Sequence, residues 1–325
     1  MKVSAIIPVA PFEPDILIEK SVESLRALDC SDLDFQAYYV VDSCGSDYSR
    51  LFHMLPPNFH VITRENSRGR RAGAINDTLS ILKDTDFIAL FDVDSRPYKD
   101  FVKECIAALN AENSAVLASG CRFVTNKVNT LSKIVSIEYK FFCDVYRFSS
   151  RSKGFIQFNG AIGVSKADFL RKAAFDEECS CEDLDISEKI YLSGNQAILA
   201  ETKVGEQAPT CVQDLYKQRV RWFRGAAEGI SKYLMPIWSA RMSISKKTTW
   251  LCSLTIPFFS YLLVPYLPLY LRRVSKESDS LSESVKILLG LVGHACLMTV
   301  CGAVAIGQHA TSHKCEWAEV SRSEI

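Results

Sequence analysis

Short apolar runs alternate with amphipathic stretches along the first third of the chain. The runs at 3–9, 35–41 and 87–91 have the length and composition of buried strands. Between them lie segments with apolar residues at helical spacing, such as Ile18 and Val22. Strands that alternate with helices of about 10 to 15 residues indicate βαβ units, so the pattern predicts an α/β fold with a mostly parallel sheet flanked by helices.

The pattern predicts further elements along the rest of the chain. We expect strands at 60–63, 115–124 and 196–200, and helices at 74–82, 97–109 and 131–148. The segment 154–164 is punctuated by glycine and is expected to be irregular. A later helix is expected to carry residues 218–222.

The last quarter of the chain holds two long apolar stretches, 248–271 and 285–306. The first is almost uncharged and would measure about 36 Å as a helix, long enough to cross a bilayer. Pro257, Pro265 and Pro268 lie within it, and proline kinks a helix. The two stretches predict a C-terminal transmembrane helical hairpin, with a pair of buried or interfacial helices as the alternative.

These patterns divide the chain into four predicted segments. Residues 1–230 form the α/β domain, 231–247 an amphipathic linker at the membrane interface, 248–306 two transmembrane helices and 307–325 a polar tail.

Composition bears on two questions, whether the protein binds nucleic acid and in which cell compartment it lies. Lys and Arg together number 38, and so do Asp and Glu, so the net charge is zero and no basic field points to nucleic acid. The 12 cysteines include no Cys-x-x-Cys pair. We expect them to be reduced and mostly buried, which places the α/β domain on the cytoplasmic side of the cell membrane.

Asp92 and Asp94 stand where the buried strand 87–91 ends. Residues two apart in an extended chain point to the same side, so the two carboxylates could share one hard cation, or one could bind the cation and the other a sugar hydroxyl. Carboxylate oxygens suit Mg²⁺ or Mn²⁺, whose coordination is usually completed by substrate phosphates. Open α/β sheets also bind ligands beyond the carboxyl ends of their strands. An ordinary solvated turn is the alternative.

Three further features accompany this pair in a definite order. They are Asp42 after the second strand, the pair Glu182 and Asp183, and the motif Gln218-x-x-Arg221-Trp222. Each also has an ordinary structural explanation: a turn cap, acids favoured by a helix dipole, and an amphipathic helix. The joint order and spacing favour one chemical site over three coincidences.

This order resembles the motifs of family 2 glycosyltransferases with the GT-A fold, in the branch of cellulose, chitin and hyaluronan synthases and ceramide glucosyltransferase. That branch carries D, D-x-D, E-D and Q-x-x-R-W, which match the four features above, and residues 71–76 resemble its K-A-G-x-L-N segment. The resemblance covers residues 1–230 and implies a Rossmann-like catalytic domain. Ser43 and Cys44 stand where the family usually has a second acid and a glycine, Cys181 replaces Thr or Gly, and Arg71 replaces Lys.

The resemblance implies a role for each matching residue. Asp183 is the general base, with Glu182 beside it; Pro8, Asp42, Arg71, Asp92, Gln218 and Arg221 bind the nucleotide sugar; Asp92 and Asp94 bind Mg²⁺ or Mn²⁺; and Asn159, Gly160 and Trp222 bind the acceptor. A single base suffices for direct displacement at the anomeric carbon, which inverts that centre.

The implied function is that of a membrane-associated, inverting hexosyltransferase. It transfers sugar from a nucleotide-diphosphate sugar, first of all a UDP-sugar, to a hydroxyl of a lipid-linked or glycan acceptor. A processive polysaccharide synthase is the alternative within the family, although those synthases build a channel from more spans than two. A nucleotidyltransferase, which releases pyrophosphate, and a non-catalytic sugar-nucleotide-binding membrane protein are alternatives from other classes.

Overall fold

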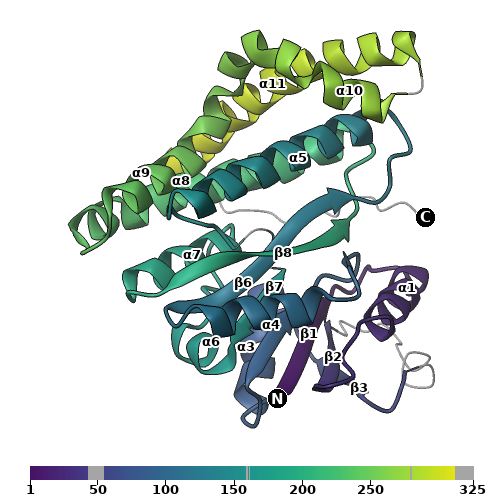
Figure 1. Cartoon of the computed structure of the whole chain (residues 1–325), viewed down its shortest axis with the longest axis vertical. Helices are drawn as coiled ribbons and strands as arrows, with labels where there is room; N and C mark the ends of the chain where they lie inside the picture. The colour runs from purple at the N-terminus through teal and green to yellow at the C-terminus, as the bar shows by residue number, and fades with distance from the viewer. Residues whose placement is uncertain (43–54, 159, 161, 279, 312–325) are drawn as a thin grey trace. The chain divides into compact units, whose positions relative to one another are not determined.

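The computed structural model describes residues 1–42, 55–158, 160, 162–278 and 280–311. Its strands are β1 (Lys2–Val9), β2 (Asp34–Asp42), β3 (Phe59–Arg64), β4 (Phe87–Leu90), β5 (Arg96–Pro97), β6 (Ala115–Val124), β7 (Gly163–Lys166) and β8 (Gln196–Glu206) (Figure 1). Its helices are α1 (Asp15–Arg26), α3 (Arg70–Ile81), α4 (Phe101–Ala111), α5 (Thr130–Arg151), α6 (Ala167–Ala173), α7 (Glu182–Leu192), α8 (Val212–Ser239), α9 (Ile244–Thr255), the 3₁₀ helix η2 (Ile256–Tyr270), α10 (Leu271–Glu277) and α11 (Leu281–Ala310).

Packing divides the chain into two compact units that do not follow residue order. The first unit contains residues 1–121 and 156–205, and the second contains 122–155 and 206–325. Helices α5 and α8 therefore pack with the C-terminal helices, although the predicted α/β domain, residues 1–230, includes both expected helices. The catalytic boundary at residue 230 stays a prediction.

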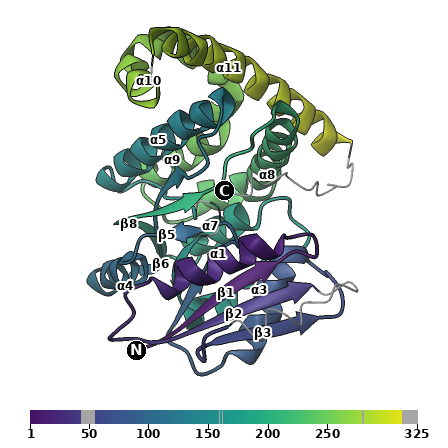
Figure 2. The same cartoon turned by 90° about the vertical axis from the view of Figure 1, so that its right-hand side faces the viewer.

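The parallel strands of the first unit end at the same edge of the sheet. Strand β1 pairs in parallel with β2 on one side and with β4 on the other, and β2 pairs with β3. Figure 2 shows β1, β2 and β3 side by side. Since Asp42 ends β2 and Asp92 follows β4, the two acids leave the sheet at this shared carboxyl edge.

The other half of the sheet corrects the prediction of a mostly parallel sheet. In the described residues, the strands run in the order β3-β2-β1-β4-β7-β6-β8-β5, and β7 pairs antiparallel with both β4 and β6. Strand β7 includes Gly163 and Val164, from the stretch expected to be irregular. A side chain at Gly163 would approach the carbonyl oxygen of Ala118 to 2.4 Å, so this close pairing requires glycine. The α/β class with flanking helices is confirmed, but the sheet is mixed.

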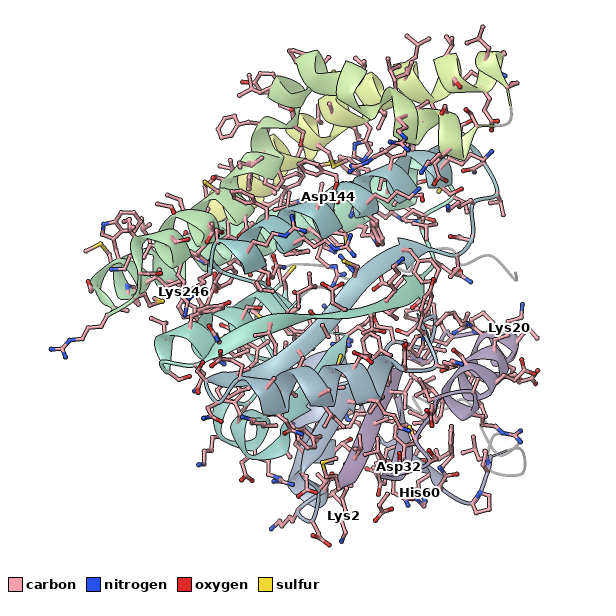
Figure 3. All side chains as sticks on the ribbon, in the orientation of Figure 1. Lys2, Lys20, Asp32, His60, Asp144 and Lys246 are labelled. Carbon is pink, nitrogen blue, oxygen red and sulfur yellow. The ribbon has the colours of Figure 1, made fainter. Side chains whose placement is uncertain are left out.

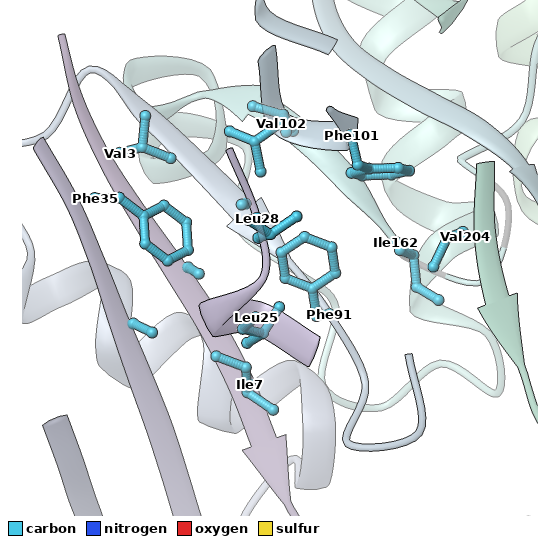
Figure 4. Close-up of a cluster of buried hydrophobic side chains, with 14 of the residues drawn as sticks. Val3, Ile7, Leu25, Leu28, Phe35, Phe91, Phe101, Val102, Ile162 and Val204 are labelled. Carbon is cyan, nitrogen blue, oxygen red and sulfur yellow. The ribbon is translucent and has the colours of Figure 1, made fainter. Parts of the chain in front are cut away.

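The core of the first unit lies between one face of the sheet and helices α1 and α4. Leu25 of α1 and Leu28, just after that helix, belong to the same apolar cluster as Phe35 of β2 (Figure 4). Phe91 packs against Phe101 of α4 in this cluster. This apolar layer holds α1 and α4 against the sheet by removing large side chains from water. Charged side chains of both signs, including Lys2, Lys20 and Asp32, lie at the surface of the unit (Figure 3).

The second unit is built on α5, α8 and α11. Helix α5 begins with a capping box, in which Asn129 Oδ1 accepts a hydrogen bond of 2.9 Å from Ser132 N–H and Ser132 Oγ accepts one of 3.1 Å from Asn129 N–H. Ile134 of α5 packs with Ile287 of α11. Val220, Phe223, Met298 and Cys301 form the α8–α11 contact.

The first predicted membrane span is not one continuous helix. Helix α9 ends at Thr255 and gives way to η2, which begins just before Pro257, because a proline interrupts the hydrogen bonding of an α-helix. Within the described residues, α11 is the one helix long and apolar enough to cross a membrane, and length and composition alone support this. The first part of the predicted linker 231–247 is helical, because α8 continues to Ser239.

The prediction that all cysteines are reduced is wrong for two of them. Cys121 and Cys143 are disulfide-bonded, whereas Cys30 and Cys105 carry thiols. Burial raises the pKa of Cys30 to about 11 and that of Cys105 further, so both thiols stay protonated at neutral pH.

Candidate active site

Asp92 and Asp94 lie in a turn and not on an extended strand. Strand β4 ends at Leu90, the Asp92 N–H donates to Ser95 Oγ at 2.9 Å, and the Ser95 N–H donates to the Asp92 carbonyl oxygen at 3.0 Å. The alternation of side chains along a strand therefore does not decide where the two carboxylates point. The prediction that both carboxylates point to the same side assumed an extended strand, and this assumption is wrong. Both residues nevertheless lie at the predicted carboxyl edge of the sheet.

Asp42 is buried in an ion pair that the sequence analysis did not anticipate. Arg64, the last residue of β3, pairs in register with Asp42 and donates from Nη1 to its Oδ1 at 2.8 Å. The Nε of the same guanidinium donates to Asp77 Oδ2 of α3 at 2.9 Å. Arg64 also donates to the carbonyl oxygens of Arg68 and Arg70, so one buried side chain joins β2, β3 and the start of α3.

Burial is the dominant influence on the ionisation of Asp42. It raises the pKa of the carboxyl, and the nearby Asp77 raises it further, while Arg64 acts in the opposite direction through charge and hydrogen bonding. The pKa remains above its ordinary value. Arg64 is therefore the group that keeps a buried acid available as a charged acceptor.

Helix α3 starts at Arg70, four residues earlier than predicted, and this places Arg71 in its first turn. Gly69 and Arg70 have φ values of 61° and 49°, and the left-handed pair turns the chain sharply into the helix. A Cβ at Gly69 would lie 2.5 Å from Oε2 of Glu177, so a substitution would have to displace that side chain as well as adopt the left-handed conformation.

Arg71 joins the two acidic motifs of the first unit. Its Nε donates to Asp92 Oδ1 at 2.7 Å and its Nη1 donates to Glu182 Oε1 at 3.2 Å. Burial alone would lower the pKa of Arg71, but the charges of Asp92, Glu182 and Asp183 together raise it, so the guanidinium stays ionised. A planar fork can hold two carboxylates at once, a task that the compact ammonium of lysine performs less well.

Asp183 begins a ladder of contacts along one face of α7. Asp183, Ser187 and Tyr191 are spaced by four residues and therefore lie one above another. Asp183 Oδ2 accepts the N–H of Gly160 at 3.0 Å, Ser187 Oγ accepts that of Phe158 at 2.8 Å, and the Tyr191 hydroxyl accepts that of Ile156 at 2.8 Å. Three successive turns of α7 thus hold the segment that was predicted to bind the acceptor.

This ladder also orients the proposed base. The Leu184 N–H donates to Asp183 Oδ1 at 2.9 Å, so both carboxylate oxygens accept backbone hydrogen bonds. Such bonds favour the charged form of a carboxylate and fix its direction. Gly160 has a φ of 67°, which glycine adopts without strain. Asn159 lies outside the described residues.

Gln218, Arg221 and Trp222 lie on α8 in the second unit, where their spacing places them on one helical face. The Oε1 atom of Gln218 is buried and has no hydrogen-bond partner among the described residues. The Trp222 ring lies beneath two guanidinium groups, with the Cζ of Arg219 at 3.9 Å and that of Arg122 at 5.7 Å from its centroid. Cation–π contacts of this kind hold an indole in one orientation.

The acidic residues suit a metal that is completed by substrate. The described residues contain no cluster of three or more His, Cys, Asp or Glu side chains that could enclose a metal by themselves. Mg²⁺ and Mn²⁺ sites in phosphate-transferring enzymes commonly use one or two carboxylates together with the phosphates. The oxygen ligands of Asp92 and Asp94 fit such a shared site.

Pro8, predicted to bind the nucleotide sugar, lies near the carboxyl end of β1 and is half-buried.

Arg64 and the α7 ladder are the parts of the site that sequence reasoning missed. Arg64 stood at the start of a basic, glycine-containing loop, where arginines are usually exposed. The Asp-x-x-x-Ser-x-x-x-Tyr spacing of α7 was a visible signal, since polar residues at intervals of four mark one helical face.

Comparison with known proteins supports the resemblance. Glucomannan 4-beta-mannosyltransferase 2 of Arabidopsis thaliana is 27% identical over 187 residues, which cover 55% of this chain and 35% of that protein. A probable glucomannan 4-beta-mannosyltransferase 15 of the same plant is 27% identical over 218 residues, covering 63% and 40%. The chain thus spans well under half the length of these curated relatives.

Solved structures share the fold. A mannosyltransferase from Pyrobaculum calidifontis in complex with GDP-Man and Mn²⁺ superposes with a TM-score of 0.68 at 16% identity, covering 96% of this chain and 87% of that one. Residues 1–349 of TarS from S. aureus, in complex with UDP-GlcNAc, superpose with a TM-score of 0.51 at 14% identity, covering 96% of this chain and 92% of that fragment. These similarities establish the GT-A architecture expected from the motifs.

The profile of a known family matches most of the chain. Glycosyl transferase family group 2 matches residues 87–307, a range that includes Asp92, Asp94, the Glu182–Asp183 pair and the motif on α8. More than half of the 325 residues lie in this match. The chain belongs to glycosyl transferase family group 2.

Proposed function

We propose that this chain is a metal-dependent, inverting hexosyltransferase that transfers a sugar from a nucleotide-diphosphate sugar to a glycan hydroxyl. The observation that carries the proposal is the orientation of Asp183, whose carboxylate accepts two backbone hydrogen bonds beside the Glu182–Arg71–Asp92 linkage. A fixed carboxylate next to a charged, nucleotide-binding edge is the arrangement that general-base displacement requires.

Each residue has an assigned part in the proposed reaction. Asp183 removes the proton of the acceptor hydroxyl as its oxygen attacks the anomeric carbon, and the nucleoside diphosphate leaves from the opposite face. Asp42 and Pro8 hold the nucleobase, and Arg221 and Gln218 hold the diphosphate. Asp92 and Asp94 would hold Mg²⁺ or Mn²⁺, which when bound would neutralise the charge that develops on the diphosphate. Gly160, Asn159 and Trp222 position the acceptor.

The names of the relatives change the preferred donor and acceptor. The sequence alone favoured a UDP-sugar and a lipid-linked acceptor. The curated relatives are named glucomannan mannosyltransferases, and the P. calidifontis structure contains GDP-Man. We therefore propose GDP-mannose as the first donor and a β-linked glycan as the acceptor. Repeated addition to that glycan, the processive alternative, then produces a ladder of chain lengths, whereas single addition produces one product.

Release of nucleoside diphosphate tests this function directly. With Mn²⁺ and β-1,4-mannotetraose, we expect GDP release from GDP-mannose that exceeds release from UDP-glucose and UDP-GlcNAc. EDTA should abolish the release and added Mn²⁺ should restore it, because the diphosphate then regains its counter-charge. Pyrophosphate in place of GDP would identify a nucleotidyltransferase. Donor binding without any release would identify a sugar-nucleotide-binding protein, and activity that survives EDTA would remove the metal from Asp92 and Asp94.

We also propose that the second unit binds a membrane surface through the outer face of α11. Ile287, Cys301 and Ala305 on one side of this helix are fully buried, whereas Leu289 and Val300 are 68% and 53% exposed. A helix that is apolar on its outer face leaves a surface that lipid can cover. The cytoplasmic orientation remains a prediction.

Co-sedimentation of the full chain with phosphatidylcholine–phosphatidylserine vesicles tests this attachment. The double variant Leu289→Glu/Val300→Glu should pellet several-fold less than the natural chain, because each charge must be dehydrated to enter the lipid. Ile81→Glu, at an equally exposed position of α3, is the matched control and should pellet normally. Equal pelleting of all three proteins would show that attachment lies elsewhere.

A further inference from the structure

A buried charged cluster in the second unit connects α5, α8 and α11. Arg219 of α8 is 2% exposed and donates from Nη2 to Glu138 Oε2 of α5. The other carboxylate oxygen of Glu138 lies 3.7 Å from Nε2 of His294 of α11, which is a contact beyond hydrogen-bond range. This nitrogen is buried and has no hydrogen-bond partner among the described residues. Each of three helices therefore contributes one titratable side chain to a largely buried region.

The cluster ends on the indole of Trp222. Arg219 lies over this ring at 3.9 Å, while its Nε and Nη1 atoms have no hydrogen-bond partner among the described residues. The position of the guanidinium thus depends on Glu138 and on the ring itself. A buried arginine with one carboxylate partner follows that carboxylate when it moves, because loss of the contact would leave further donors unsatisfied at a cost in free energy. The guanidinium therefore keeps its place only if the carboxylate is also held.

Two more contacts show that the indole is part of a rigid arrangement. Arg122 lies over the same ring at 5.7 Å and over Tyr139 at 4.9 Å, and it pairs with Glu206 at 3.1 Å. Leu297, one turn after His294 on α11, packs in the apolar cluster that includes Trp222. Helix α11 therefore reaches the Trp222 region through the packing of His294 against Glu138 and through Leu297.

We propose that His294 is a positioning residue for Trp222. By packing against Glu138, it confines this carboxylate, which holds Arg219 over the indole, and so links the C-terminal helix α11 to the Gln-x-x-Arg-Trp segment of α8. This inference rests on the proposed function in one respect, because Trp222 is there an acceptor-binding residue. A displacement of α11 relative to α5 then changes acceptor binding without changing any residue that touches the donor.

Steady-state kinetics with GDP-mannose and β-1,4-mannotetraose test this role. His294→Ala should raise the KM for mannotetraose by about 2- to 30-fold, the range for residues that act through a neighbour, and leave the KM for GDP-mannose unchanged. Glu138→Gln, which keeps the side-chain volume, should produce the same acceptor-specific defect. His294→Gln, whose side chain keeps much of the volume that confines Glu138, should bring the KM back toward the natural value.

Glu283→Ala is the matched control. Glu283 of α11 also pairs with α5, through Lys133 at 2.5 Å, and it lies about three helical turns before His294. Loss of this ion pair should leave both KM values unchanged. If His294→Ala and Glu283→Ala shift the acceptor KM equally, or neither shifts it, His294 is an ordinary packing residue.

Tryptophan fluorescence provides a readout that does not need activity. His294→Ala should change the emission of Trp222, because the overlying guanidinium moves, and the change should disappear in a Trp222→Phe background. An emission spectrum identical to that of the natural chain would overturn the proposal. If the natural chain releases no GDP, the proposed function fails, and the emission comparison still decides whether His294 positions the indole.

Discussion

Asp183→Asn should reduce the turnover number by about 10²- to 10⁴-fold, the usual contribution of a general base. The amide is nearly isosteric with the carboxylate but cannot remove a proton from the acceptor. The donor should still bind, because Asp92, Arg71 and the rest of the nucleotide edge are unchanged. Initial rates with saturating donor and acceptor, together with a GDP-mannose titration of each protein, measure the two effects separately.

Ser187→Ala is the control that separates chemistry from loop structure. Ser187 supports the same segment as Asp183, by accepting the N–H of Phe158 at 2.8 Å, but it cannot act as a base. We expect a smaller loss for this variant, mainly in acceptor KM. Turnover by Asp183→Asn at the natural rate would remove Asp183 from the base role, and equal losses in both variants would mean that Asp183 supports the loop and nothing more.

Arg64→Leu should have the largest effect on stability, a loss of about 3 to 5 kcal/mol in the free energy of unfolding. The substitution leaves Asp42 buried without its positive partner and removes the contacts of Arg64 with Asp77 and the start of α3. An uncompensated charge in this setting is costly because burial opposes its ionised form. Urea unfolding followed by circular dichroism measures the loss.

The deficit of Arg64→Leu should shrink as the pH falls. Burial and Asp77 already raise the pKa of Asp42, and removal of Arg64 takes away the influence that lowers it. The folded state then binds a proton more tightly than the unfolded state, so protonation through this raised pKa favours folding. The loss should be greatest at neutral pH and smallest at acidic pH, below the folded-state pKa of Asp42.

Arg68→Leu is the matched control for this prediction. Arg68 also pairs with Asp77, at 2.6 Å, but its side chain is 55% exposed. Exposed ion pairs contribute about 0 to 1 kcal/mol, so this variant should unfold close to the natural urea concentration at every pH. If both variants lose the same stability, or if the deficit of Arg64→Leu does not depend on pH, the buried Asp42–Arg64 pair does not have the energetic role assigned to it.

Local patterns predicted the elements and the acids that follow them. The apolar run before Asp92 and the helical spacing of residues 131–148 each depend on neighbours in the chain, and both became the expected elements, β4 and α5. The order of the acidic motifs led to the correct family. Such signals survive folding because strand and helix periodicity is a property of consecutive residues.

The predictions that failed concern structural features that depend on tertiary contacts. The direction of β7 was not predicted, because it depends on pairing with β4 and β6. The start of α3 was not predicted either, and it lies where Arg64 donates to the carbonyl oxygens of Arg68 and Arg70. Apolar composition alone could not show that η2 interrupts the helix that begins with α9.

By itself, the sequence determined the α/β class, the order of the elements and the identity of the acids, since these follow from local periodicity and residue chemistry. Only the tertiary structure decided which partners those acids have. Arg64 of β3 reaches Asp42 of the neighbouring strand β2, Gly160 reaches Asp183 across 23 residues, and His294 lies against Glu138 from a distant helix. Charge, burial and direction depend on these long-range neighbours, and no local pattern encodes them.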